Sequence, residues 1–164
     1  MNPIYIHHGS THFDPAKFTP IRNSEWQPKP EGGLWGSRVD AEYGWKEWSQ
    51  ANQFNIDALE TSFRFTLPNA RILFIKSTAQ LEQLPKLHPW ESDSTNWLNG
   101  IMADGKITMD QLYTPQWCYL DYEKISESYD AIEIREPWNF RDALPTWDCD
   151  SVVILNGSVV VVEV

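Results

Sequence analysis

The sequence predicts a single α+β domain over residues 1–164. Apolar residues follow helical spacing mainly in the first two thirds of the chain, whereas its end consists of short β-prone runs. Helices and strands that are separated along the chain in this way are typical of α+β proteins. A chain of 164 residues buries about 70% of its unfolded surface. We therefore expect it to fold without disulfides or metal, and no repeat or linker divides it.

The N-terminal region contains two expected strands. Residues 3–6 alternate as a short strand, and residues 11–22 form a loop with one weak helical turn. The Gly32-Gly33 pair then marks a turn, after which a second strand begins at Leu34. Both expected strands therefore lie directly beside glycine.

Expected helices cover residues 40–51, 77–87, 97–102 and 109–125. The first carries one side of mostly aromatic residues, which we expect to pack beneath the glycine-rich segment: Tyr43, Trp45, Trp48 and Ala51. Pro85 should end the second helix early, because proline has no backbone N–H to donate. Pro115 interrupts the last one.

Two hairpins are expected. The first pairs residues 63–67 with residues 71–76 as antiparallel strands, joined by Pro68-Asn69-Ala70. Another strand spans residues 129–135. The second hairpin folds residues 151–164 back on themselves at Asn156-Gly157, a dipeptide typical of type I′ turns.

Composition narrows the class of protein and its partners. Aromatic residues make up 13% of the chain, with nine tryptophans, which indicates a core or cleft built on large rings. A net charge of −10 disfavours nucleic acid and favours a protein partner. No apolar run approaches the length of about 20 residues that crosses a bilayer, and a basic signal-peptide start is absent. We expect a cytoplasmic protein without membrane contact.

The cysteines and the surplus tryptophans are expected to be structural. Cys118 and Cys149 are too few for a disulfide framework and lie outside metal-ligand spacing, so no metal site is predicted. Both are expected as core thiols. The remaining tryptophans are also expected in the core: Trp90, Trp97, Trp117, Trp138 and Trp147.

Two short segments near the N-terminus carry the functional signal. They are Ile4-Tyr5-Ile6-His7-His8-Gly9-Ser10 and Lys29-Pro30-Glu31-Gly32-Gly33-Leu34-Trp35-Gly36-Ser37-Arg38. Each places a polar or aromatic side chain beside glycine, which allows backbone to approach a flat ligand closely. Together they predict a nucleotide pocket.

These segments resemble motifs of a known family. Residues 6–13 are similar to the strand and loop that open the catalytic domain of poly(ADP-ribose) polymerases and diphtheria-toxin-like ADP-ribosyltransferases. Residues 33–37 resemble the family's second motif, Gly-x-Tyr-Phe-Ala. The expected hairpin at 63–76 and the Tyr-Asp-Ala-Ile-Glu-Ile segment from Tyr129 extend the resemblance to small bacterial and phage members. The resemblance implies split antiparallel β-sheets with flanking helices.

The resemblance also implies roles in binding NAD. His8 would act as a catalytic-site residue that hydrogen-bonds the nicotinamide ribose, while the Gly9 backbone pairs with the carboxamide and Ser10 orients the adenosine. Trp35 stands where the family has tyrosine and would stack on the nicotinamide ring. The implied cofactor-binding set is His8, Gly9, Ser10, Gly33, Trp35 and Ser37.

The third motif of the family, a glutamate on a late strand, has no direct counterpart. Asp150 is the nearest carboxylate on the corresponding strand, whereas alignment with small phage members places Glu136 in the catalytic role. We rank Glu136 first, Asp150 second and Glu133 third. Under the structural alternative, the two glutamates belong to a solvated strand, Trp35 is a core ring and His8 lies in a turn.

The leading hypothesis is an NAD-dependent mono-ADP-ribosyltransferase that modifies a protein, with a toxin, effector or phage counter-defence role. Two alternatives stay open. The missing glutamate favours an inactive binding or inhibitor module on the same fold. An NAD glycohydrolase would use the same pocket with water as the acceptor.

Overall fold

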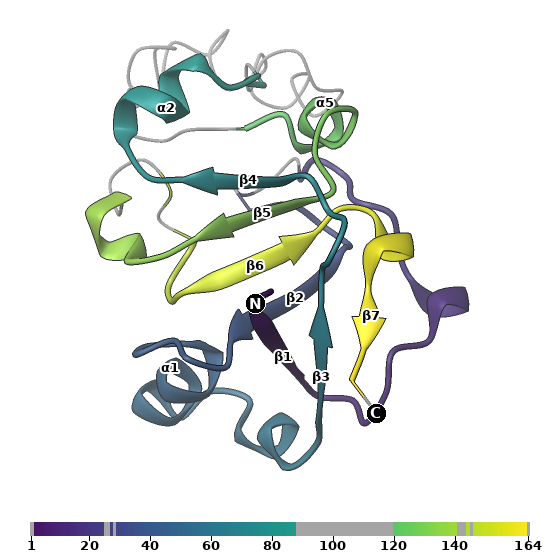
Figure 1. Ribbon diagram of the computed structural model, residues 1–164. Helices are drawn as coiled ribbons and strands as arrows, with labels where there is room; N and C mark the ends of the chain where they lie inside the picture. The colour runs from purple at the N-terminus through teal and green to yellow at the C-terminus, as the bar shows by residue number, and fades with distance from the viewer. Residues whose placement is uncertain are drawn as a thin grey trace, which may run out of the picture.

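The computed structural model describes residues 2–24, 27, 29–87, 120–140, 144 and 146–163. Its seven strands form one curled sheet in the order β4-β5-β6-β2-β1-β3-β7 (Figure 1). The strands are β1 (Ile4–His8), β2 (Leu34–Arg38), β3 (Ser62–Thr66), β4 (Ile72–Ile75), β5 (Ala131–Ile134), β6 (Ser151–Ile154) and β7 (Val161–Val162). The described helices are α1 (Trp45–Asn52), α2 (Thr78–Gln83) and α5 (Tyr122–Ser126), with 3-10 turns at Pro15–Lys17, Ile56–Glu60, Pro137–Phe140 and Gly157–Val159. The predicted α+β class is confirmed.

The pairing between β1 and β2 is short. These strands pair antiparallel only at Tyr5 with Arg38 and at Ile6 with Ser37. Beyond that point β1 continues along β3 as far as His8, while β2 continues along β6. Figure 1 shows the result, with β4, β5 and β6 running across the direction of β3 and β7. The two strand groups are thus joined by two residue pairs.

The expectation of split antiparallel sheets is met only in part. β4 and β5 are parallel, from Ile72 opposite Ala131 to Ile75 opposite Ile134. A parallel pair needs a long crossover connection, and here the chain between β4 and β5 provides it. The two-pair junction between β1 and β2 also joins the groups into a single sheet.

The first predicted hairpin does not form, although both strands exist. β3 pairs with β1 and β7, whereas β4 pairs with β5. The turn after Leu67 is present, because the Ala70 N–H donates to the Leu67 carbonyl at 3.4 Å. It carries the chain from one strand group to the other, so a local turn signal did not determine the pairing partner.

The second predicted hairpin is also wrong. β6 pairs with β2 and β5, and β7 pairs with β3. Asn156 has an extended backbone, with φ −123° and ψ 104°, which does not fit a type I′ turn. Its side chain instead accepts from the Ser158 N–H at 3.1 Å and starts the turn at Gly157–Val159. The chain therefore leaves β6 toward the far edge of the sheet.

The described helices follow the predictions in part. α1 begins at Trp45, later than predicted, because Gly44 caps it and donates its N–H to Glu47 Oε2 at 3.0 Å. α2 ends before Pro85, as predicted. Only the end of the helix predicted at 109–125 is described, as α5, and the helix predicted at 97–102 lies outside the described residues.

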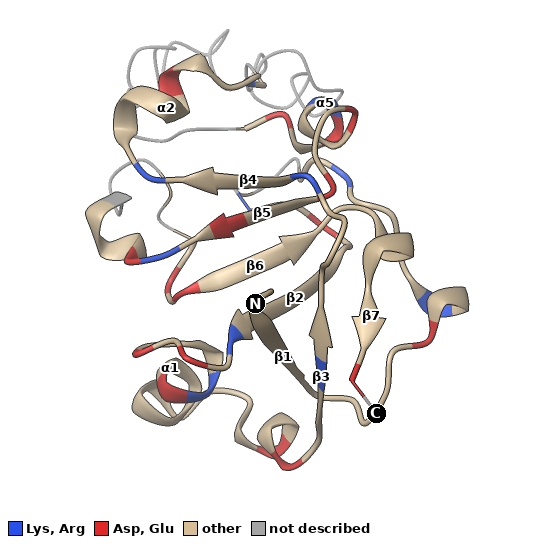
Figure 2. Cartoon of the chain, in the orientation of Figure 1, with Lys and Arg blue, Asp and Glu red and all other residues tan. Residues whose placement is uncertain are grey.

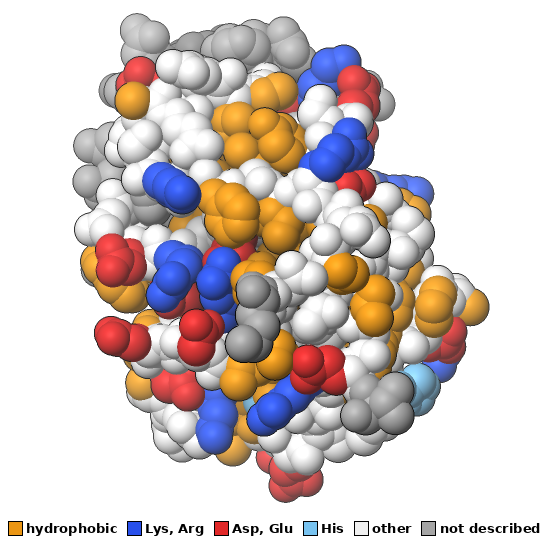
Figure 3. Space-filling view, viewed as in Figure 1, with side chains coloured by type: hydrophobic (Ala, Val, Ile, Leu, Met, Phe, Trp, Pro, Cys, Tyr) orange, Lys and Arg blue, Asp and Glu red, His pale blue; other side chains and the backbone are white. Residues whose placement is uncertain are grey.

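Two apolar clusters enclose the centre of the sheet. One contains Ile132 and Val153 with side chains of α2 and α5, and the other contains Phe65, Val152 and Ile154. Alternation along β5 and β6 supplies both clusters, so these strands are buried on both faces. Figure 3 shows that hydrophobic side chains also reach the surface between charged groups.

Asp130 anchors the ends of three strands. Its carboxylate accepts from the Arg71 N–H at 2.9 Å, from the Arg71 guanidinium at 3.0 and 3.1 Å, and from Asn156 Nδ2 at 3.1 Å. Its carbonyl accepts the Leu155 N–H at 2.8 Å. These bonds connect the start of β4, the start of β5 and the end of β6. The Arg71 guanidinium lowers the pKa of Asp130.

We predict that Asp130→Asn destabilises the fold by about 2 kcal/mol, because charge-assisted hydrogen bonds are lost. Since the folded protein holds the pKa of Asp130 low, its contribution is complete above about pH 4 and is lost as the pH falls below that value. Urea unfolding from pH 2 to 7 should show the two proteins converging in acid. Glu127→Gln, which removes an exposed ion pair with Lys124, is the control and should leave stability unchanged.

Candidate functional site

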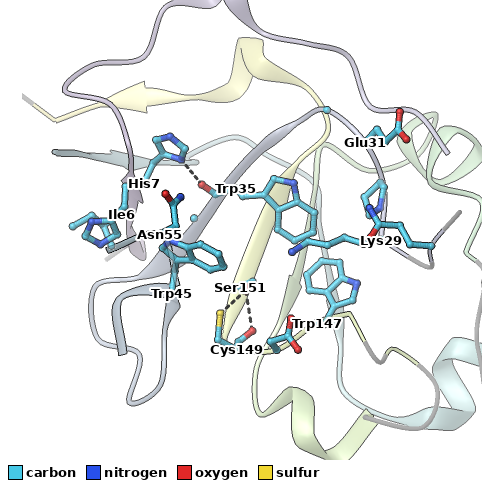
Figure 4. A pocket seen from close by; sticks show the side chains of 16 residues that line it. Ile6, His7, Lys29, Glu31, Trp35, Trp45, Asn55, Trp147, Cys149 and Ser151 are labelled. Carbon is cyan, nitrogen blue, oxygen red and sulfur yellow. Dashed lines mark hydrogen bonds between the residues drawn. The ribbon is translucent and has the colours of Figure 1, made fainter. Parts of the chain in front are cut away.

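A pocket of about 500 Å³ opens where β1 and β2 diverge (Figure 4). It is lined by Ile6, His7, His8, Gln27, Lys29, Pro30, Glu31, Gly32, Trp35, Gly36, Trp45, Asn55, Trp147, Asp148, Cys149 and Ser151. Gly36 is required there, because a Cβ atom at this position would lie 2.9 Å from the Ile6 carbonyl. The predicted residues His8, on β1, and Trp35, on β2, both line this pocket.

The two histidines have different surroundings. His7 Nδ1–H donates to the Trp35 carbonyl at 2.6 Å and so bridges the strands after their ladder ends (Figure 4). His8 Nδ1 is buried, and no described residue supplies it with a hydrogen-bond partner. Burial also lowers the pKa of His8, which keeps the imidazole neutral at neutral pH. His8, which lines the pocket, thus carries a buried nitrogen without a hydrogen-bond partner among the described residues.

Tryptophans form the apolar part of the wall. The rings of Trp35 and Trp147 lie 4.9 Å apart between centroids and are tilted by 56°. Trp147 is buried, as predicted, and its indole N–H donates to the Tyr122 hydroxyl at 3.3 Å. Because it also lines the pocket, it is both a core residue and a site residue. Trp138 was predicted in the core, but 53% of it is exposed.

Glu133, the third-ranked catalytic candidate, is committed to the sheet. Its carboxylate accepts from the Tyr5 hydroxyl at 2.7 Å and from Arg38 at 2.6 and 3.2 Å. Figure 2 shows this acidic position within β5, and the residue is only 2% exposed. Burial raises the pKa of Tyr5, and the bond to Glu133 raises it further. Glu133 does not line the pocket.

The two higher-ranked carboxylates also lie away from the pocket lining. Glu136 is exposed and has φ +54°, and its side chain accepts from Asn139 Nδ2 at 3.2 Å. Asp150 is buried and accepts the Glu136 N–H at 2.7 Å through Oδ1. Burial raises the pKa of Asp150. The structure brings these two residues together but does not bring them to His8.

The remaining predicted binding residues, Gly9, Ser10, Gly33 and Ser37, do not line the main pocket. Ser10 and Gly33 line a second cavity of about 220 Å³, which shares His7 with the main pocket. The Gly9 N–H donates to the Thr61 carbonyl at 3.0 Å. Ser37 is buried, donates to the Asp150 carbonyl at 2.7 Å and accepts the Trp45 N–H at 2.9 Å. Ser37 therefore positions the start of α1.

Three residues without a predicted binding role also line the pocket. Asp148 and Cys149 precede β6, and Lys29 lies on the proline-rich segment before β2. Burial raises the pKa of the Cys149 thiol to about 11, so it stays protonated at neutral pH and is a poor nucleophile. It is a buried free thiol, as predicted, whereas Cys118 lies outside the described residues. The run Asp148-Cys149-Asp150 directly after Trp147 is the sequence feature that could have indicated this part of the pocket.

Neither a metal centre nor a similarity to known proteins assigns a function to the pocket. No group of His, Cys, Asp and Glu among the described residues has an arrangement that could hold a metal ion, and no described helix is long and apolar enough to span a membrane. Comparison with protein-family models, with curated proteins and with solved structures finds no match. The interpretation of the pocket therefore depends on its residues.

We predict that Glu133→Gln costs about 3 kcal/mol of stability, because it leaves a largely buried Arg38 guanidinium without its counter-charge. Glu136→Gln, the matched change at an exposed position, should alter stability by less than about 0.5 kcal/mol. Chemical denaturation of both variants measures the difference. Equal stability of the two variants would contradict the structural assignment of Glu133.

Proposed function

We propose that the pocket binds NAD and that the protein transfers ADP-ribose from NAD to a protein acceptor. The observation that carries this proposal is the convergence of His8 and Trp35 on one pocket from two diverging strands. These are the residues to which the family resemblance gives the ribose-binding and ring-stacking roles. Their convergence was not guaranteed by sequence spacing.

The pocket residues fit a dinucleotide. A volume of about 500 Å³ lies within the usual range of roughly 300–1,000 Å³ for small-molecule sites. Indole rings provide flat apolar walls, and the free His8 Nδ1 provides a buried polar contact. The second cavity, which Ser10 lines, shares His7 with the main pocket and could accept a further part of an extended ligand.

The sheet supports the proposal at a coarser level. The resemblance implies two sets of strands with the cleft between them, and here two strand groups meet at a junction of two residue pairs. The pocket opens directly beside this junction. This arrangement is compatible with an ADP-ribosyltransferase-like fold.

The pocket points to a catalytic carboxylate other than those ranked from the sequence. Breaking the nicotinamide–ribose bond develops positive charge on the ribose, so a nearby carboxylate is required. Glu31 and Asp148 are the carboxylates among the described lining residues. We assign the role to Asp148. It directly follows Trp147 in the chain, and its charge attracts the ammonium group of Lys29, which contacts Trp35. Both carboxylates are exposed, and Glu31 has no comparable effect on Lys29.

A protein acceptor is supported by a third cavity. This cavity, of about 210 Å³, shares Trp147 and Asp148 with the main pocket and is bordered by the exposed Trp138. An exposed tryptophan is a common anchor in protein interfaces. An acceptor side chain that entered here would approach Asp148, and the net charge of −10 favours a basic acceptor.

We predict that NAD raises the melting temperature by about 5 °C or more at roughly 100 times its Kd, because it binds only the folded state. Assay of nicotinamide and of free ADP-ribose in the same sample then separates the alternatives. Nicotinamide release that requires an added protein supports transfer, and equal release of free ADP-ribose without one indicates hydrolysis. Binding without release indicates an inactive module.

We predict that Asp148→Asn lowers kcat at least 100-fold while NAD still binds, since the carboxylate acts mainly on charge that develops in the transition state. Glu136→Gln and Asp150→Asn are the controls and should retain turnover if they fold. Loss of turnover in Glu136→Gln, with Asp148→Asn active, would restore the first-ranked sequence assignment.

We predict that His8→Ala weakens NAD binding about tenfold, because the ligand loses a buried hydrogen bond. Glu127→Ala, which changes an exposed side chain outside both cavities, should bind NAD normally. Isothermal titration calorimetry measures both affinities. Unchanged binding by His8→Ala would remove the main support for the proposed site.

A further inference from the structure

A lysine already contacts the ring that is proposed to hold nicotinamide. Lys29 Nζ lies 4.3 Å from the centroid of the Trp35 ring, a cation–π distance. Figure 4 shows the Lys29 side chain reaching from its segment toward Trp35 and Trp147. The ammonium therefore occupies space inside the pocket, next to its aromatic wall.

Lys29 does not have the solvated environment that is usual for a lysine side chain. No carboxylate in the described part of the chain forms an ion pair with Lys29, and Asp148 attracts it only over a longer range. Burial lowers the pKa of Lys29, which reflects loss of water around the ammonium. The negative face of an indole partly offsets that loss. The geometry is therefore that of an aromatic site which stabilises a positive charge.

We propose that Trp35 and Trp147 form a binding site for an organic cation, that Lys29 occupies this site in the ligand-free protein, and that the positively charged pyridinium ring of NAD displaces it. The inference rests on the proposed function for the identity of its ligand. The site itself is defined by the Lys29 and tryptophan contacts.

The proposal makes the site selective for charge. The oxidised nicotinamide ring is a cation, whereas the reduced ring is neutral and of nearly the same size. A desolvated cation–π contact accounts for a preference of about 5- to 30-fold. Lys29 opposes binding in two ways, because it fills the site and because its charge repels a second cation. Removing its charge should therefore strengthen binding of cations more than binding of neutral rings.

Two small probes test the site without involving the phosphates of NAD. They are 1-methylnicotinamide, which is a cation, and nicotinamide, which is neutral. Their affinities are measured by quenching of tryptophan fluorescence in the wild type, in Lys29→Met and in Lys29→Gln. Lys76→Met is the matched control, because Lys76 also lies over an aromatic ring, that of Phe74, but outside the pocket. Thermal unfolding verifies that each variant is folded.

The expected result is that 1-methylnicotinamide binds the wild type at least fivefold more tightly than nicotinamide does. Lys29→Met and Lys29→Gln should increase the affinity for the cation at least fivefold and change the affinity for nicotinamide less, whereas Lys76→Met should behave as the wild type. Equal affinities for the two probes, absence of binding by either, or an unchanged cation affinity in both Lys29 variants would overturn the proposal.

The outcome is separable from that of the proposed function. If NAD binds and is cleaved but the probes show no charge preference, the proposed function stands and the Lys29 inference fails. If the cation preference and its dependence on Lys29 are found but NAD is not cleaved, the cation site stands and the proposed enzymatic activity fails.

Discussion

The buried carboxylate of Glu133 bonds to the short junction at which β1 and β2 join the two strand groups. Tyr5 and Arg38, its hydrogen-bond partners, are also one of the two residue pairs that join β1 to β2. Glu133 lies on β5, on the far side of β6 from this junction. Its bonds therefore reach across the sheet and fix the curl, because charge-assisted bonds in a buried setting tolerate little displacement. The cooperating groups come from three strands that are distant in sequence.

The pocket is a consequence of this arrangement. Since β1 follows β3 and β2 follows β6 beyond the junction, a space opens between them that backbone pairing cannot fill. His7 satisfies the Trp35 carbonyl across the opening, and the rings of Trp35 and Trp147 form its wall. Tyr5, which bonds to Glu133, and His8, which lines the pocket, lie on opposite faces of β1, because side chains alternate along a strand. This alternation explains why Glu133 does not line the pocket.

Most strands were predicted near their observed positions, whereas their partners were not. The turn after Leu67 and the Asn156-Gly157 dipeptide are genuine breaks in the chain, but neither folds its flanking strands onto each other. Asp130 shows the reason at β4, because its bonds to Arg71 and Asn156 connect segments that no local pattern links. Strand pairing depends on burial and on such long-range bonds, which compete with local turn preferences.

The α+β class, the positions of the main strands and the pair His8 and Trp35 could be predicted from the sequence, because hydrophobic periodicity and glycine positions are local properties. Which carboxylates reach the pocket depends on the folded chain. The Asp150 carboxylate accepts the backbone N–H of Glu136, Glu133 bonds to Tyr5 and Arg38, and Asp148 lines the cavity. The folded chain also places Lys29 on Trp35. These choices depend on how separate strands and loops meet in space, which residue spacing along one chain does not encode.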